Sequence, residues 1–178
     1  MGRRRNIVTD RLVLKPSVDE RDLTIYKTHL MECDPEEFYF QYGEERSEEF
    51  MELIDFHSSP VKYYTVFLKE TDEMVGYVGL NPHGRECCEL EFYIFGEFRR
   101  NHYAHEACSA VINEFWEGRL LKSCSRCVIA ETITRNKICC SFLESLGFTK
   151  EAQGMRIMLN SEGEFENGLG LTRYELAA

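Results

Sequence analysis

The stretch from residue 90 to residue 117 constrains the fold of this chain more than any other. It joins an apolar run, LEFYIF (90–95), through a polar segment to an amphipathic run, AHEACSAVINEFWE (104–117). The apolar residues of the second run recur at the spacing that places side chains on one face of a helix: Ala104, Cys108, Val111 and Phe115. The stretch therefore predicts a buried strand, a short turn and a helix that packs on a sheet.

The turn between these runs has charged residues where an anion-binding turn usually has glycine. The first N–H groups of a helix have no partner within the helix, so a strand–turn–helix junction suits phosphate. Glycine usually lets the backbone approach the phosphate closely. This turn contains no glycine and has four basic side chains instead: Arg99, Arg100, His102 and His105. Two interpretations stay open: a phosphate site in which charge replaces glycine, or a merely polar start to a helix.

Hydrophobic periodicity predicts strands and helices along the rest of the chain. We expect strands at 6–15, 62–69, 74–80, 88–95, 127–133, 148–159 and 168–176. We expect helices at 17–31, through the acidic residues that follow to about 56, at 104–117 and at 136–146. Ser17 and Glu20 form a capping box for the first helix, and Gly147 ends the last one. This order predicts a single α/β (α+β) domain over residues 1–178 with a mixed sheet.

Composition excludes several classes of protein. No apolar run approaches the roughly 20 residues that a membrane span needs, and no apolar segment follows the basic N-terminus, so we expect a cytoplasmic protein without a membrane partner. The chain has 8 cysteines, which we expect to be reduced and to pack as small apolar residues. Cys124 and Cys127 form a C-x-x-C, but no second pair has matching spacing, so we expect no metal.

The negative charge is concentrated in one segment. The formal net charge is −10, and residues 32–55 hold ten acidic residues and one basic residue, which accounts for −9 of it. Such a segment repels nucleic acid, so we expect no nucleic-acid partner. It is either a solvated helix face or a negative rim that attracts a cationic substrate. Aromatic residues that could hold an ammonium group lie among the acids: Phe38, Tyr39, Phe40 and Tyr42.

Four stretches together resemble the GNAT-type N-acetyltransferases, and in particular the group of ribosomal-protein alanine and serine N-acetyltransferases and spermidine acetyltransferases. They are TDRLVLK (9–15), MVGYVGL (74–80), ELEFYIFGEFRRNHYAHEA (89–107) and NKICCSFLESLGFTKE (136–151). The resemblance implies a central, splayed, mostly antiparallel sheet flanked by helices. Acetyl-CoA would lie between the strand that ends near Phe95 and the strand at 127–133. A homodimer is common among such proteins.

The resemblance also implies which residues bind the co-substrate. The pyrophosphate would lie on the turn formed by Arg99, Arg100, Asn101, His102, Tyr103 and Ala104. The family pattern there is Arg/Gln-x-x-Gly-x-Gly/Ala, so His102 replaces a glycine and Arg100 takes a position that is often glycine. Arginine tolerates a positive φ less well than histidine or asparagine does. The thioester carbonyl and pantetheine would contact the backbone of Phe92, Tyr93 and Ile94, and the Asn136 amide would contact pantetheine or water. Asn136 is also placed to be the N-cap of the helix that follows it.

For catalysis the resemblance implies Glu131 as the base; the other interpretation of Glu131 is a glutamate at a strand end that faces solvent or pairs with Arg135. Glu89 and Glu91, which share one face of the neighbouring strand, are the alternative bases. Many family members use a tyrosine as the acid, at the position of Leu143 here. Others have Asn-x-x-Ser, which reads Asn136-x-x-Cys139 in this chain, so Cys139 is either an acid or a structural cysteine. We expect an acetyl-CoA-dependent N-acetyltransferase that acts on a primary, cationic amine. The alternative is a non-catalytic acyl-CoA-binding or regulatory domain.

Overall fold

The computed structural model describes residues 5–16, 62–84, 86–121, 127–159 and 165–177. Within these residues, eight strands form one mixed sheet in the order β1-β2-β3-β4-β5-β6-β8-β7. The strands are β1 (Ile7–Val8), β2 (Leu12–Lys15), β3 (Lys62–Leu68), β4 (Met74–His83), β5 (Cys87–Ile94), β6 (Cys127–Ile133), β7 (Thr149–Leu159) and β8 (Phe165–Ala177). The helices are α4 (Tyr103–Trp116) and α5 (Lys137–Ser145), and a short 3-10 turn, η2 (Gly96–Phe98), follows β5.

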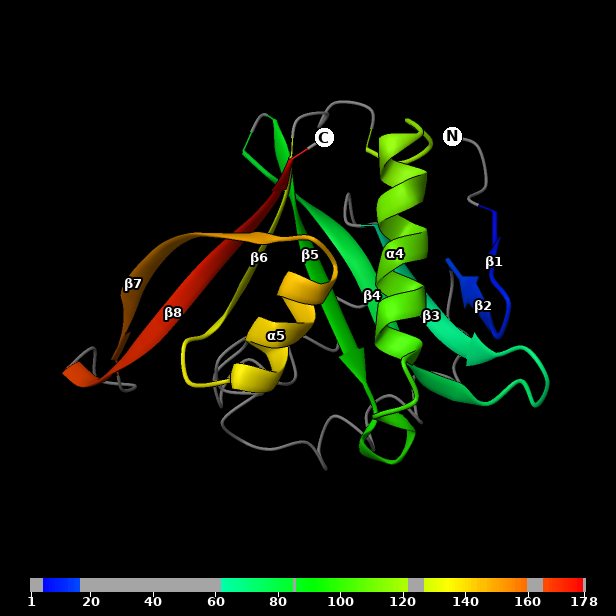
Figure 1. Cartoon of the computed structure of the whole chain (residues 1–178), viewed down its shortest axis with the longest axis horizontal. Coiled ribbons are helices and arrows are strands. Elements are labelled where there is room, and N and C mark those ends of the chain that lie inside the picture. The colour runs from blue at the N-terminus through cyan, green and yellow to red at the C-terminus, as the bar shows by residue number, and fades with distance from the viewer. Residues whose placement is uncertain (1–4, 17–61, 85, 122–126, 160–164, 178) are drawn as a thin grey trace.

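The sheet opens at its centre, between β5 and β6. Every other pair of neighbouring strands is antiparallel, whereas β5 and β6 are parallel and pair over three residues each, Cys87–Glu89 with Cys127–Ile129. Beyond these pairs the two strands separate, as Figure 1 shows below the C-terminal end of β8. The predicted mixed, mostly antiparallel and splayed sheet is therefore confirmed.

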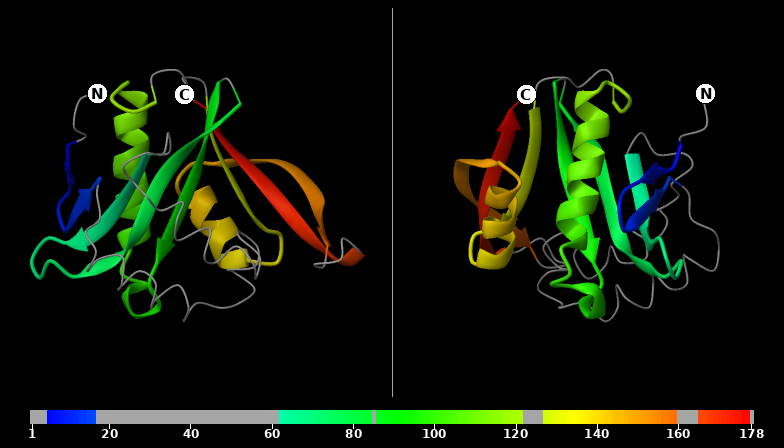
Figure 2. Two further views of the ribbon diagram at one scale, coloured as in Figure 1. Left: turned by 180° about the vertical axis from the view of Figure 1, so that it is seen from behind. Right: turned by 45° about the vertical axis from the view of Figure 1, so that its right-hand side comes forward.

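Both described helices pack on one face of this sheet. α4 covers β2, β4 and β5, and α5 packs against β6 and β7 (Figures 1 and 2). Alternate residues of a strand face opposite sides of a sheet, and on β5 Cys88 and Leu90 join the core beneath the helices. On the same face the Phe92 ring lies 4.8 Å from the Phe142 ring of α5. The odd-numbered residues of β5 therefore face the opposite side.

The predicted strand at 6–15 is wrong in one respect, because the chain reverses within it. β1 and β2 form a tight hairpin in which Val8 pairs with Val13. The Thr9 N–H donates to the Leu12 carbonyl at 3.0 Å, and the Thr9 hydroxyl accepts from the Leu12 N–H at 3.0 Å. A threonine side chain that bonds to nearby backbone groups stabilises such a turn. The predicted helices at 17–31 and to about 56, and with them the acidic segment 32–55, lie outside the described residues.

The expectation of reduced cysteines is wrong for one pair. Cys87 and Cys127 form a disulfide, with their Cα atoms 4.8 Å apart, at the closed end of the β5–β6 opening. These two residues are direct neighbours in the parallel register, and that register cannot be read from a spacing of 40 residues. Four other described cysteines are thiols, and three of them are buried: Cys88, Cys108 and Cys140. The fourth, Cys139, is partly exposed.

Candidate active site

The separation of β5 and β6 creates a cleft of about 480 Å³. Its walls are the diverging strands, α5 along its length, and the turn that joins β5 to α4 with the first residues of α4. In the part of the chain that the structure describes, no strand pairs with the β6-facing edge of β5 beyond Glu89. Alternate residues of a strand direct their backbone groups to opposite edges, so some of the backbone groups here are placed to meet a bound molecule. Phe92, Tyr93 and Ile94 all line the cleft.

Two carboxylates stand where the strands begin to part. Glu91 on β5 and Glu131 on β6 each lie two residues beyond the last β5–β6 pair, Glu89 with Ile129. Side chains two residues apart share a face, so both carboxylates lie on the face opposite the helices, and both line the cleft. The arrangement offers two bases at the same level of one cleft.

The Glu91 carboxylate is held by two neighbours that the sequence analysis missed. The Tyr63 hydroxyl donates to one oxygen at 2.5 Å, and the Asn81 amide donates to the other at 3.3 Å. Burial, and then the negative charge of Glu91, raise the pKa of Tyr63, so the hydroxyl keeps its proton and donates it. The Tyr63 ring lies over Gly79, where an added Cβ would be 2.1 Å from the ring. No motif marks Tyr63 in the sequence, because strand register alone brings it to Glu91.

Glu131 borders a second hollow as well as the cleft. This hollow measures about 350 Å³ and is lined by β6, β7 and β8, with Gly154 and Arg173 among its residues. Arg173 is the cross-strand partner of Glu131, but its guanidinium pairs with Glu151 at 2.9 Å. Glu131, Glu151 and Arg173 together carry a net charge of −1. Glu131 thus lies between the cleft and the second hollow and lines both.

The remaining catalytic candidates are placed unequally. The Oε2 atom of Glu89 lies 3.7 Å from His83 Nδ1, and Glu89 is not among the residues that line the cleft. Asn136 and Cys139 both line the cleft at the start of α5. Asn136 caps this helix as predicted, because its side-chain oxygen accepts from the Cys139 N–H at 3.0 Å. The Asn136 amide N–H₂ group is not used by this bond. Leu143 also lines the cleft and is buried.

The turn after β5 adopts the backbone conformation that its missing glycines would have provided. Arg100 has φ +64° and His102, the N-cap of α4, has φ +63°. Left-handed conformations cost about 1–2 kcal/mol for residues that carry a Cβ. The comparison with the family pattern thus identified the two strained positions. The first N–H groups of α4 have no partner within the helix, and residues of this helix start line the cleft, which suits a phosphate site.

Most of the predicted co-substrate residues line the cleft, and two have further roles. The lining residues at this end are Arg99, Arg100, His102, Tyr103 and Ala104, and also His105. Arg99 Nε donates to the Ile94 carbonyl at 2.9 Å, which ties the turn to the end of β5. Asn101 does not line the cleft. Its amide donates instead to the Phe98 and Arg99 carbonyls at 3.2 Å each.

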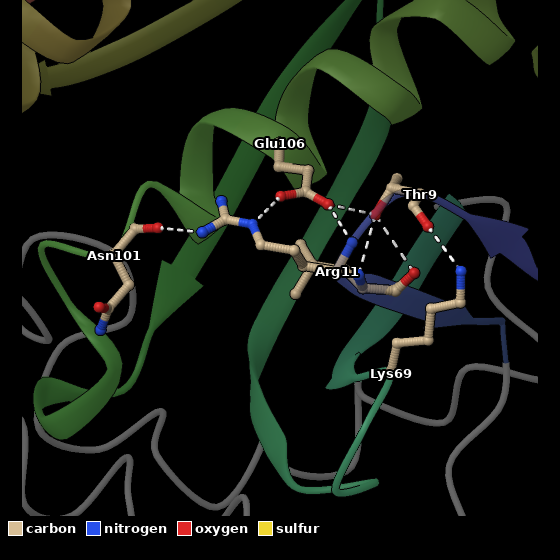
Figure 3. A network of polar contacts seen from close by, with 6 residues as sticks. Thr9, Arg11, Lys69, Asn101 and Glu106 are labelled. Atoms are coloured by element: carbon tan, nitrogen blue, oxygen red, sulfur yellow. Dashed lines mark hydrogen bonds and ion pairs between the residues drawn. The ribbon is translucent and has the colours of Figure 1, made fainter.

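Glu106, in the first turn of α4, joins this region to the β1–β2 hairpin (Figure 3). Its carboxylate accepts from the Thr9 hydroxyl at 2.5 Å, from the Arg11 N–H at 2.9 Å and from Arg11 Nε at 2.8 Å. Burial alone would raise the pKa of Glu106, but the hydrogen bonds from Thr9 and Arg11 outweigh it and hold the pKa below the ordinary value of 4.5.

This lowered pKa predicts how stability depends on pH. The stabilisation from ionised Glu106 is complete above the unfolded-state pKa and is lost as pH falls through the lower folded-state pKa. The free-energy difference between the wild type and Glu106→Gln should therefore shrink between about pH 5 and about pH 3. Urea unfolding of both proteins across this range measures it. A difference that stays constant on acidification would show that the carboxylate is not preferentially ionised in the folded state.

In the described residues, no group of three or more His, Cys, Asp or Glu side chains is arranged to hold a metal ion. Nor does any helix there have the length and apolar character needed to cross a membrane.

The fold and the site together define an α/β enzyme whose site is the opening between two parallel strands of a mixed sheet. A family model described as an acetyltransferase (GNAT) domain matches residues 11–149, so the chain belongs to the GNAT acetyltransferases. Enzymes of this family use acetyl-CoA. The family resemblance inferred from the sequence is therefore confirmed.

Several solved structures share this fold at low sequence identity. A GNAT-family acetyltransferase from Bacillus anthracis is 16% identical, with coverage of 97% of this chain and 98% of that chain and a TM-score of 0.74. The spermidine N-acetyltransferase of Vibrio cholerae, solved with CoA and spermine, is 15% identical, with 95% and 96% coverage and a TM-score of 0.71. RimL, a ribosomal alpha-N-protein acetyltransferase solved with coenzyme A, is 16% identical, with 97% and 98% coverage and a TM-score of 0.69. No curated protein matches by sequence.

Proposed function

We propose that this chain is an N-acetyltransferase that moves the acetyl group of acetyl-CoA to a cationic primary amine. The observation that carries the proposal is the distribution of charge along one cleft. Basic residues and helix N–H groups lie at the open end, and the carboxylates of Glu91 and Glu131 lie where the strands part. The first end suits a pyrophosphate, and the second suits an ammonium group that must lose a proton.

The chemistry follows from this placement. The turn and the first N–H groups of α4 hold the pyrophosphate, and the open edge of β5 holds pantetheine, which directs the thioester toward the two carboxylates. The deprotonated amine attacks the thioester carbonyl carbon, so a C–N bond forms and the C–S bond breaks. The proton that the nitrogen then releases balances the proton that the leaving thiolate takes up. Backbone N–H groups on the open edge stabilise the oxyanion. We assign the base to Glu131, because it also borders the second hollow, from which an amine could enter.

A cationic acceptor fits the charges near the base. Glu91 and Glu131 are both acidic, and the paired Glu151 and Arg173 add no net charge. The acidic segment 32–55 lies outside the described residues, and its formal charge of −9 has the sign that attracts a cationic amine. Proteins of the same fold are named for spermidine and for protein N-termini, which are both amines. A polyamine, a small amine or a basic peptide N-terminus therefore forms the first set of acceptors to screen.

Binding of the co-substrate gives the direct test of the charged turn. Arg100→Ala keeps a Cβ at the strained position and removes the charge, so it isolates the contribution of the guanidinium. We expect it to weaken CoA binding about 3- to 10-fold at low salt, and less at high salt, because salt screens exposed charges. Calorimetric titration measures the CoA affinity at low and at high salt. Lys150→Ala on β7, outside the cleft, is the control for the loss of a positive charge.

Three results would change the proposal. If Arg100→Ala and the wild type bind CoA equally well at every salt concentration, the charge of Arg100 does not contribute to CoA binding. A wild type that binds no CoA at millimolar concentration would contradict the proposed co-substrate. CoA binding without turnover of any amine in the screen would favour the alternative, a non-catalytic acyl-CoA-binding domain, which the buried Leu143 in place of the family's tyrosine also favours.

A further inference from the structure

We propose that Arg11, together with Glu106 and Thr9, is a positioning group that holds the glycine-free turn in the conformation that binds coenzyme A. The proposal rests on the proposed co-substrate. Thr9 and Arg11 belong to TDRLVLK (9–15), a stretch that marks the family in the sequence but has no part in the chemistry described above. The hairpin that contains them lies at the far edge of the sheet from the cleft-forming strand β6.

The turn needs an external support because two of its residues are strained. Arg100 and His102 both have left-handed backbone angles, which glycine adopts freely and residues with a Cβ do not. Such conformations persist where surrounding contacts determine them, and they cluster at functional sites. The His102 side chain makes no capping bond to α4, so the helix start is not held by its own N-cap residue.

Arg11 contacts the chain on both sides of His102. Its Nη1 donates to the Asn101 carbonyl at 3.0 Å, so it contacts the peptide between the two strained residues. Its guanidinium carbon lies 4.9 Å from the centre of the Tyr103 ring. Its Nε donates to Glu106 at 2.8 Å. One planar side chain thus fixes the residue before His102, the residue after it and the first turn of α4. Figure 3 shows its bonds to Asn101 and Glu106.

The clamp formed by Thr9, Arg11 and Glu106 is anchored on the sheet and not on the turn itself. The Lys69 N–H donates to the Arg11 carbonyl at 2.8 Å, and Lys69 Nζ reaches the Thr9 carbonyl at 3.4 Å. The hairpin is therefore bonded to the turn between β3 and β4. Figure 3 shows the whole series, from Lys69 through Thr9 and Arg11 to Glu106 and Asn101. This fixed support can hold the strained backbone in place.

The geometry points to positioning and not to a direct phosphate contact. Arg11 does not line the cleft, and its Nε and Nη1 groups are already bonded to the protein. The two roles also predict opposite signs for Glu106. Removing a negative charge near a phosphate site would strengthen anion binding by electrostatics alone, whereas loosening the clamp would weaken it.

The first test compares three single variants. Arg11→Met keeps the aliphatic stem and removes the guanidinium. Arg11→Lys keeps the charge and removes the planar fork. Lys15→Met is the matched control, because it removes a positive charge from the same hairpin. The Lys15 ammonium group pairs with Asp72, which is not part of the turn after β5. We expect Arg11→Met and Arg11→Lys to weaken CoA binding about 5- to 20-fold each, independently of salt, and Lys15→Met to leave it unchanged.

The second test uses the sign of the Glu106 effect and a rescue. Glu106→Gln should weaken CoA binding about 3-fold or more, against the electrostatic expectation. His102→Gly relieves the left-handed strain, so Arg11→Met should cost less in the His102→Gly background than in the wild type. In steady-state kinetics the KM for acetyl-CoA should rise with Arg11→Met, while kcat and the KM for the amine stay near the wild-type values.

A third measurement needs no ligand. The Glu106 N–H donates to the His102 carbonyl at 3.1 Å, and this is the first backbone hydrogen bond of α4. Amide hydrogen exchange at Glu106 in the unliganded protein should quicken about 10-fold or more in Arg11→Met, and not in Lys15→Met.

These outcomes separate the clamp from the proposed function. Unchanged exchange at Glu106 in Arg11→Met, or full CoA affinity in Arg11→Lys, would overturn the clamp. Tighter CoA binding by Glu106→Gln would overturn it in favour of simple electrostatics. If the wild type binds no CoA, the proposed function is contradicted. If Arg11→Met nevertheless quickens amide exchange at Glu106, the clamp itself holds.

Discussion

Glu131→Gln is expected to lower turnover roughly 10- to 1,000-fold and to leave the affinity for acetyl-CoA nearly unchanged. The carboxylate stands where β5 and β6 separate and faces both the cleft and the second hollow. A base that removes a proton from the attacking amine acts in the chemical step, so its loss should appear in kcat and in kcat/KM together. Glutamine has nearly the same shape, and it lines the same walls without accepting a proton.

The neighbouring carboxylates provide the comparison. Glu89→Gln is the matched control, because Glu89 is on the same face of β5 as Glu91 but does not line the cleft. We expect the turnover of Glu89→Gln to stay near that of the wild type. Glu91→Gln tests the alternative base, and Tyr63→Phe tests whether the 2.5 Å bond to Glu91 matters for it. If Glu131→Gln turns over at the wild-type rate and Glu91→Gln does not, the base is Glu91. If both single variants retain full turnover, neither carboxylate is the base.

Gly76→Ala is expected to destabilise the protein by about 2–4 kcal/mol. Gly76 pairs with Ile94 at the end of β5, and it has φ +152°, a conformation that side chains rarely adopt. A Cβ there would be 2.0 Å from the Tyr93 carbonyl oxygen and 3.0 Å from the Ile94 Cα. Both contacts are with backbone, so β4 and β5 would have to move apart. Because Tyr93 and Ile94 line the cleft, we also expect weaker CoA binding in the folded fraction.

Denaturant unfolding of three glycine variants separates crowding from strain. Gly96→Ala, two residues after Ile94, has no atom within 4 Å of the new Cβ and no positive φ, so it should change stability by less than about 0.5 kcal/mol. Gly84→Ala has φ +66° and open space, so it should cost about 1 kcal/mol from backbone strain alone. If Gly76→Ala costs no more than Gly84→Ala, the close approach of β4 to β5 is not a constraint on the fold.

Local patterns in the sequence were sufficient for most of the elements. The expected strand at 127–133 matches β6 (Cys127–Ile133), and the helix expected at 104–117 begins and ends within one residue of α4. Asn136 caps α5 and Gly147 has φ +92°, as the sequence indicated. These features depend on residues close in the chain, where hydrophobic period, capping and backbone freedom decide the structure.

The candidate site was accessible from the sequence by a different route. The family pattern identified the turn and the two positions that lack glycine, and Arg100 and His102 do have positive φ. It also led to Glu131 and Asn136, which line the cleft. Asn101 was assigned to the co-substrate because it lies within the motif, but its side chain bonds back to the turn. Membership of a motif does not determine where a side chain points.

What the sequence by itself determined is the order of strands and helices, the family and the strained turn, because each is recorded in neighbouring residues. What the tertiary structure alone decided is which distant residues meet. The Cys87–Cys127 disulfide, the bond from Tyr63 to Glu91 and the clamp from Arg11 to Glu106 join residues 40, 28 and 95 positions apart. Each depends on strand register or on the packing of α4 beside the hairpin. A shift of one residue in register turns every side chain of a strand to the other face, so only the assembled sheet brings these groups together.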